Sequence, residues 1–175
     1  KLVVVHETGS VQELAIQNKG RLPVFIQSGD IVKGGRQDRV LRSDMIVPPR
    51  SGRIPLASFC VESGRWSKRS GEDAGRFASN SAMVSSRELK LAAKYVQNQS
   101  AVWSNVDKQQ KLLNEKLRQM KGDQSLDVRS GKSATSLQLT LENKELRQMA
   151  AEYKQKLAGL LRGRSDAVGF AFVVN

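Results

Sequence analysis

The residues best suited to chemistry lie in the stretch CVESGRW at positions 60–66, which holds the only cysteine of the chain. A nucleophilic cysteine needs a cation or a helix N-terminus to stabilise its thiolate, and an ionised Glu62 nearby would oppose this. Free cysteines are also common in protein cores. We therefore expect Cys60 to be a packed residue. Glu62, Arg65 and Trp66 are the functional candidates, because polar groups at a strand end often form ligand sites.

A second candidate stretch, GDIVKGGRQDRVL at 29–41, surrounds a glycine turn. It carries Asp30, Lys33, Arg36, Gln37 and Arg39, whose planar donors, together with backbone N–H groups, could bind a phosphate or a carboxylate. A charged hairpin tip has the same composition, so that alternative stays open.

Several familiar signatures are absent. The run SGKS at 130–133 resembles the end of a phosphate-binding P-loop, but that pattern requires glycine at position 126, which is Leu126. One cysteine and one histidine leave too few nitrogen and sulfur ligands for structural zinc. We therefore predict no metal site, and the sequence indicates no particular cofactor.

The composition indicates anionic partners. The net charge is +12 and the pI is about 10.2, which favours nucleic acid, anionic lipid or a phosphorylated metabolite. Aromatic residues make up only 5% of the chain, which is poor material for stacking bases, and a solvated basic surface has the same composition.

No apolar run approaches the roughly 18–20 residues of a membrane span. The opening KLVVVHETGS has no signal-peptide pattern. Because the true N-terminus is not seen, the compartment stays open, with the cytoplasm slightly favoured.

The elements that must position these residues change along the chain. Residues 1–62 contain short β-branched or apolar runs separated by Gly, Ser, Pro and Asn, which predicts strands. The short spacings leave no room for crossover helices, so antiparallel pairing is expected. Alternation along 54–62 places Cys60 and Glu62 on one face of a strand and Phe59 and Val61 on the other. Residues 63–85, rich in Ser and Gly, are predicted to form a long loop.

Residues 86–163 have a helical period. One long helix is predicted up to Gly122, with an apolar seam at steps of three and four. A second is predicted to end near Gly163, with Leu146, Met149, Ala150, Tyr153, Leu157 and Leu160 as its inner stripe. The run AVGFAFVVN at 167–175 predicts a final strand covered on both faces. The fold class is therefore α+β: one domain over 1–175, with a mostly antiparallel sheet and a long-helix pair inserted before the C-terminal strand.

Several of these runs together resemble a known prokaryotic family, the ARG and rhodanese-phosphatase-superfamily-associated protein domain. The resemblance rests on G-S-V-x-E-L at 9–14, N-x-G at 18–20, the 29–41 stretch, V-P-P at 47–49 and C-V-E-x-G-R-W at 60–66. Similar proteins begin earlier, with a further helix and strand, so we expect this chain to lack both. The family name implies a setting in NAD or ADP-ribose metabolism. The matching positions that could bind a ligand are Gln37, Arg39, Glu62, Arg65 and Trp66, with Ser136 as a weaker addition.

Three hypotheses for function follow, and whether the protein is an enzyme stays open. The first is an accessory or regulatory module that binds a phosphorylated, nucleotide-like ligand such as ADP-ribose. Arg39 and Arg65 would hold phosphate, Trp66 would offer an aromatic face, and Gln37 and Glu62 would bond to ribose or base. The second is a hydrolase of ADP-ribosyl or phosphoester bonds that uses Glu62 with a partner carboxylate or metal. The third is a nucleic-acid-binding protein, suggested by charge alone.

Overall fold

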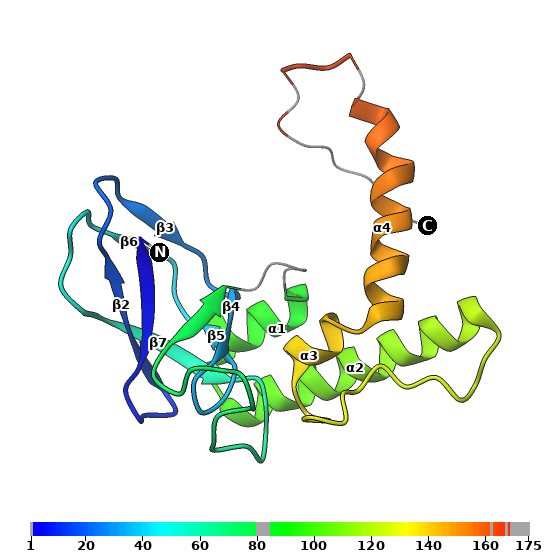
Figure 1. The fold of residues 1–175 in the computed structure, drawn as a ribbon, viewed down its shortest axis with the longest axis horizontal. Coiled ribbons are helices and arrows are strands. Elements are labelled where there is room, and N and C mark those ends of the chain that lie inside the picture. The colour runs from blue at the N-terminus through cyan, green and yellow to red at the C-terminus, as the bar shows by residue number, and fades with distance from the viewer. Residues whose placement is uncertain (1, 80–84, 162, 167, 169–175) are drawn as a thin grey trace.

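A computed structural model describes residues 2–79, 85–161, 163–166 and 168 of this chain (Figure 1). The first half forms eight short strands: β1 (Val3–Glu7), β2 (Glu13–Asn18), β3 (Val24–Ile26), β4 (Ile31–Gly34), β5 (Arg39–Leu41), β6 (Met45–Val47), β7 (Ile54–Cys60) and β8 (Phe77–Ser79). As the sequence predicts, turn residues separate these β-branched and apolar segments.

Six of the strands form one sheet in the order β1-β2-β7-β5-β4-β8, and every pair in it is antiparallel. The two edges of this sheet approach each other. His6 on β1 forms a bridge with Arg76, next to β8, and the Glu7 N–H donates to the Gly75 carbonyl at 3.1 Å. The sheet therefore curls into a nearly closed barrel, with β3 and β6 paired separately beside it (Figure 1).

The glycine turn predicted at 32–37 joins β4 to β5. Gly34 has φ 124° and Gly35 has φ 55°, in the region that favours glycine. Strand β8 packs against this turn, because it pairs with β4 on the opposite side from β5. Strand β8 lies within residues 63–85, which were predicted to be loop throughout, so that prediction is wrong at Phe77–Ser79. Phe77 is the only large apolar residue in this short strand, so alternation gives almost no signal.

The helical half begins with α1 (Arg87–Leu91) and a turn of π-helix, η1 (Ala92–Val96), before the long α2 (Gln99–Lys121). The prediction of one continuous helix from 86 to 122 is therefore wrong. Gln97 takes a left-handed conformation with φ 52°, and the Asn98 side chain then caps α2 by accepting from the Ala101 N–H at 3.0 Å. Asn98 is the local signal of this break.

Two further helices follow, α3 (Leu137–Leu141) and α4 (Lys144–Ala158), and a short 3₁₀ turn, η2 (Gly159–Leu161), ends the second. Helix α4 corresponds to the second predicted helix, but most of the residues predicted for its inner stripe are not fully buried. Leu146 is buried, whereas Tyr153 and Leu160 are 57% and 65% exposed, because α4 extends away from the barrel (Figure 1). Helix α3 was not predicted, since five residues give no readable period.

Two buried clusters hold the barrel and the helices together. One fills the space among the strands, with Leu14, Ile16, Leu41, Leu56 and Phe77 among its members. The other joins the outer face of the sheet to α1, α2 and α3: Ile31, Val40, Phe59, Val61, Leu89, Ala92, Ala93, Val102, Val106, Leu137 and Leu141. The two faces of β7 thus enter different clusters, which confirms the alternation predicted for this strand.

The structure confirms an α+β fold with a mostly antiparallel sheet and a long helix after it. The strand predicted at 167–175 lies outside the described residues, apart from Val168. In the part of the chain that the structure describes, no helix has both the length and the apolar character needed to cross a membrane.

Candidate ligand-binding site

The structure brings together the five candidate residues of the two sequence stretches. Gln37 lies in the turn before β5 and Arg39 begins that strand. Glu62, Arg65 and Trp66 follow the end of the neighbouring β7. The Gln37 Nε2 donates to the Glu62 carbonyl at 3.1 Å, and the Arg39 Nη1 donates to Gln37 Oε1 at 3.1 Å. The Arg65 Nη2 donates to Glu62 Oε2 at 2.6 Å. The guanidinium of Arg39 lies over the Trp66 ring, 5.6 Å from its centroid.

Burial divides these five residues into two groups. Arg39 and Glu62 are fully buried and Gln37 is 7% exposed, so none of them offers its polar atoms to solvent. The side chain of Arg65 is 11% exposed, and Trp66 is 43% exposed. Gln37, Arg39 and Glu62 therefore lie below the molecular surface, and Arg65 and Trp66 reach it.

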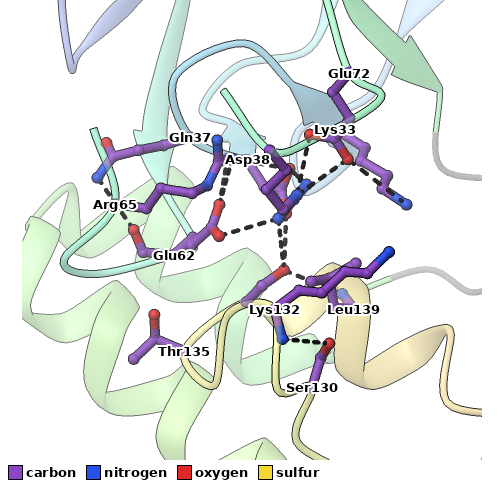
Figure 2. A network of polar contacts seen from close by, with 12 residues as sticks. Lys33, Gln37, Asp38, Glu62, Arg65, Glu72, Ser130, Lys132, Thr135 and Leu139 are labelled. Atoms are coloured by element: carbon purple, nitrogen blue, oxygen red, sulfur yellow. Dashed lines mark hydrogen bonds and ion pairs between the residues drawn. The ribbon is translucent and has the colours of Figure 1, made fainter. Parts of the chain in front are cut away.

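Arg69, which was not among the sequence-based candidates, is the centre of a buried network. Its partners Asp38, Glu62 and Glu72 are labelled in Figure 2. Its Nη2 donates to Asp38 Oδ1 at 2.6 Å, and its Nη1 donates to Asp38 Oδ2 at 2.9 Å and to Glu62 Oε1 at 3.0 Å. Its Nε donates to both oxygens of Glu72 at 3.0 Å. One guanidinium thus ties the 63–76 loop to the β4–β5 turn and to the end of β7.

The network continues to the helical half of the chain. The Lys33 Nζ, on β4, lies 2.6 Å from Glu142 Oε2 and 3.9 Å from Glu72 Oε1. Ser136 caps α3 by accepting from the Leu139 N–H at 3.1 Å, and its hydroxyl donates to Asp38 Oδ2 at 2.8 Å. Ser136, the weaker sequence candidate, is fully buried and belongs to this network.

Donors hold the Glu62 carboxylate in its charged form. Burial opposes ionisation of Glu62, but hydrogen bonds from Arg65 and Ser133, the charge of Arg69 and the Asp38 N–H outweigh it and lower the pKa of Glu62 below its usual value. Burial likewise opposes the positive charge of Arg69. The hydrogen bonds to the Asp38 carboxylate and its negative charge outweigh burial, so the pKa of Arg69 is raised. Glu62 and Arg69 therefore form a charged pair at neutral pH.

Cys60 is not an activated thiol. It is fully buried, and its Sγ donates to the Glu62 carbonyl at 2.8 Å. Burial raises the pKa of the Cys60 thiol above its ordinary value, despite the opposing effects of the Glu62 backbone and of Arg39. The sequence-based expectation that Cys60 packs in the strand agrees with this geometry.

Above the network lies an open cavity of about 600 Å³. It is lined by two short segments, residues 63–70 and residues 132–133: Ser63, Gly64, Arg65, Trp66, Ser67, Lys68, Arg69, Ser70, Lys132 and Ser133. Four of these residues are cationic and none carries a carboxylate. Among the described residues, Lys68 and Lys132 form no ion pair.

Lys68, Arg69 and Lys132 were not predicted from the sequence as site residues, because their local sequences resemble ordinary loops. The run SKRS at 67–70 has the composition of a solvated loop. Lys132 lies in the SGKS run, which was set aside because a P-loop needs glycine at 126. The absence of glycine at position 126 excludes only the P-loop fold. A lysine beside serines in a turn can contact phosphate without that fold.

This arrangement is better suited to binding than to acid–base chemistry with Glu62. Glu62 Oε1 accepts from Arg69, and Oε2 accepts from Arg65 and from the Asp38 N–H at 3.2 Å. A carboxylate with this many donors and no exposed surface is a weak base. Within the described residues, no three His, Cys, Asp or Glu side chains are placed to hold a metal ion.

The fold and the site together define an α+β domain with a barrel-like antiparallel sheet and a basic cavity where loop 63–76 meets the turn before α3. The model of the family described as the ARG and Rhodanese-Phosphatase-superfamily-associated Protein domain matches residues 1–175, so the chain belongs to this family. Searches of curated proteins and of solved structures found no match.

Proposed function

We propose that this domain is an accessory or regulatory module that binds a phosphorylated, nucleotide-like ligand in the cavity lined by residues 63–70 and 132–133. The observation that carries the proposal is the charge of the lining, which has four cationic side chains, four serines, one tryptophan and no carboxylate. Phosphate groups are recognised by such sets of charged and hydroxyl donors. A cavity of about 600 Å³ also falls within the usual size range of small-molecule sites.

The two arginines of the lining are oriented before any ligand arrives. Asp38, Glu62 and Glu72 hold Arg69, and Glu62 holds Arg65, so neither guanidinium loses much rotamer freedom on binding. Their charge is largely neutralised by these carboxylates. Lys68 and Lys132 would therefore supply the net positive charge that attracts phosphate, and the arginines would supply directed donors and rigid walls.

Trp66 supports a ligand that also carries a flat ring. Its indole is 43% exposed, and the guanidiniums of Arg36 and Arg39 lie 5.5 and 5.6 Å from its ring centroid. These contacts hold the ring at the cavity wall, and its exposed part would supply an aromatic contact to a nucleobase. The association in the family name makes ADP-ribose the first ligand to test. In this proposal Gln37, Arg39 and Glu62 act by positioning Trp66, Arg65 and Arg69.

Titration calorimetry and thermal shift with ADP-ribose, ADP, ribose 5-phosphate and adenosine test the proposal. We expect ADP-ribose and ADP to bind and to raise the melting temperature, ribose 5-phosphate to bind more weakly, and adenosine to bind least. A ligand at about 100 times its Kd stabilises the folded state by about 2.7 kcal/mol, which is easily measured.

Matched variants locate the binding. Lys132→Gln and Lys68→Gln should each weaken the binding of ADP about tenfold, because each removes a charge-assisted hydrogen bond. Trp66→Leu should weaken the binding of ADP more than that of ribose 5-phosphate. Lys156→Gln, on the exposed surface of α4, removes the same charge and should change neither. No stabilisation by any of the phosphorylated ligands at millimolar concentration would overturn the proposal.

A further inference from the structure

The separate pair of strands β3 and β6 carries an apolar surface that no described part of the chain covers. Phe25 and Ile46 lie directly opposite each other in this pair and are 63% and 68% exposed. Their neighbours Ile26 and Met45 point the other way and pack against the cluster among the strands. The pair lies at the side of the barrel away from α4 (Figure 1).

The turn before β3 adds a third apolar side chain. Leu22 is 76% exposed, and its place is fixed by Asn18, which is fully buried. The Asn18 Nδ2 donates to the Leu22 carbonyl at 2.8 Å and to the Val47 carbonyl at 3.3 Å, so the turn is tied to β6. Leu22, just before β3, and the opposed Phe25 and Ile46 are thus three exposed apolar residues near one end of the β3–β6 pair, called the apolar cluster below.

Four cations lie in the two turns at one end of the β3–β6 pair. The turn at 19–21 carries Lys19 and Arg21, and the turn at 50–53 carries Arg50 and Arg53. The turns are adjacent, because the Arg50 N–H donates to the Gly20 carbonyl at 2.9 Å and the Ser51 N–H donates to the Asn18 carbonyl at 2.8 Å. All four cations are exposed. None of them forms an ion pair with a described residue, and segments 14–29 and 45–61 contain no Asp or Glu.

We propose that this surface, made of Lys19, Arg21, Leu22, Phe25, Ile46, Arg50 and Arg53, binds peripherally to an anionic lipid bilayer. Cations attract the negative headgroups, and adjacent apolar side chains enter the boundary with the acyl chains. Duplex nucleic acid would use the cations but would leave Leu22 and Ile46 without an apolar environment. The combination therefore favours lipid. The inference does not depend on the cavity or on its ligand, because the two share no residue.

Sedimentation with vesicles tests this surface. The full chain should bind vesicles that contain about one-third phosphatidylserine in phosphatidylcholine, should bind phosphatidylcholine alone far more weakly, and should be released by added salt. Arg21→Gln/Arg50→Gln should weaken binding about 25-fold, since each cation near an anionic surface contributes roughly fivefold. Phe25→Thr/Ile46→Thr keeps residues suited to strands and should weaken binding about tenfold or more.

A charge-matched control separates this surface from net charge. Lys154→Gln/Lys156→Gln removes two exposed cations from α4 and should bind the anionic vesicles like the unchanged protein. Circular dichroism and thermal melting of each variant check its fold, and a variant that fails is replaced by its single substitutions. The proposal is overturned if the anionic vesicles are not bound, if binding is unaffected by Phe25→Thr/Ile46→Thr, or if duplex DNA binds more tightly and competes with the vesicles.

Discussion

Arg69 and Asp38 form a bidentate ion pair in which Nη2 lies 2.6 Å from Oδ1 and Nη1 lies 2.9 Å from Oδ2, with Asp38 fully buried and Arg69 only 6% exposed. The pair joins two segments that are far apart in the sequence. Arg69→Met should therefore destabilise the protein by about 3–5 kcal/mol, because it leaves Asp38 and Glu62 buried with too few donors. Guanidinium chloride unfolding measures this loss.

A double variant separates the cost of an unpaired charge from the value of the pair. Arg69→Met/Asp38→Asn should be more stable than the sum of the two single variants predicts, because neither charge is then left alone. Lys111→Met, which removes a cation from the exposed pair with Asp107, should have no measurable effect. Additive single and double values would show that Arg69 and Asp38 do not interact.

The ionised state of Glu62 should make stability depend on pH in the acid range. Because donors lower the pKa of Glu62 in the folded state below its usual value of 4.5, its contribution is fully present above pH 4.5 and is lost as pH falls through the lowered value. Glu62→Gln should cost roughly 2–3 kcal/mol at neutral pH and progressively less below pH 4.5. Urea unfolding at a series of pH values measures the difference.

A control for net charge is Glu152→Gln, which removes an exposed carboxylate from α4. It should follow the pH dependence of the unchanged protein. A Glu62→Gln curve that runs parallel to the unchanged protein down to acid pH would mean that Glu62 does not stabilise the fold through its charge.

The thiol of Cys60 should be unreactive in the folded protein. It is fully buried, and burial raises its pKa, so thiolate is both scarce and inaccessible at pH 8. A thiol reagent such as dithiobis-nitrobenzoate should label Cys60 only as fast as the protein unfolds, and immediately in guanidinium chloride. Rapid labelling without denaturant would restore the reading of Cys60 as an activated nucleophile.

Much of the fold could be predicted because local patterns and packing agree. The alternation along β7 correctly separates Leu56 from Phe59 and Val61, since the two faces of that strand enter different clusters. The break at Gln97 was missed, because the spacing of apolar residues continues across it. The exposure of Tyr153 was missed for another reason: periodicity shows which face of a helix is apolar but not whether anything covers it.

The site could be predicted only in part. Glu62, Arg65 and Trp66 stand out because polar residues follow a buried strand. Arg69 does not stand out, since its partner Asp38 lies 31 residues away and only the tertiary fold brings them together. No local pattern distinguishes Arg39, which is fully buried, from Arg65, which borders the cavity.

Gly35 should be sensitive to substitution for reasons of both conformation and space. Its φ of 55° is costly for residues with a Cβ, and a Cβ there would lie 2.3 Å from Cζ of Phe77 and 2.8 Å from Glu7 Oε2. Gly35→Ala should therefore destabilise the protein by at least 1–2 kcal/mol, roughly the cost of the left-handed conformation alone.

Gly52→Ala is the matched control, because a Cβ at Gly52 meets nothing within 4 Å and its φ is not in the left-handed region. Denaturant unfolding should show the loss for Gly35→Ala only. Equal stabilities for the two variants would mean that β8 and the β4–β5 turn do not pack as closely as the structure shows.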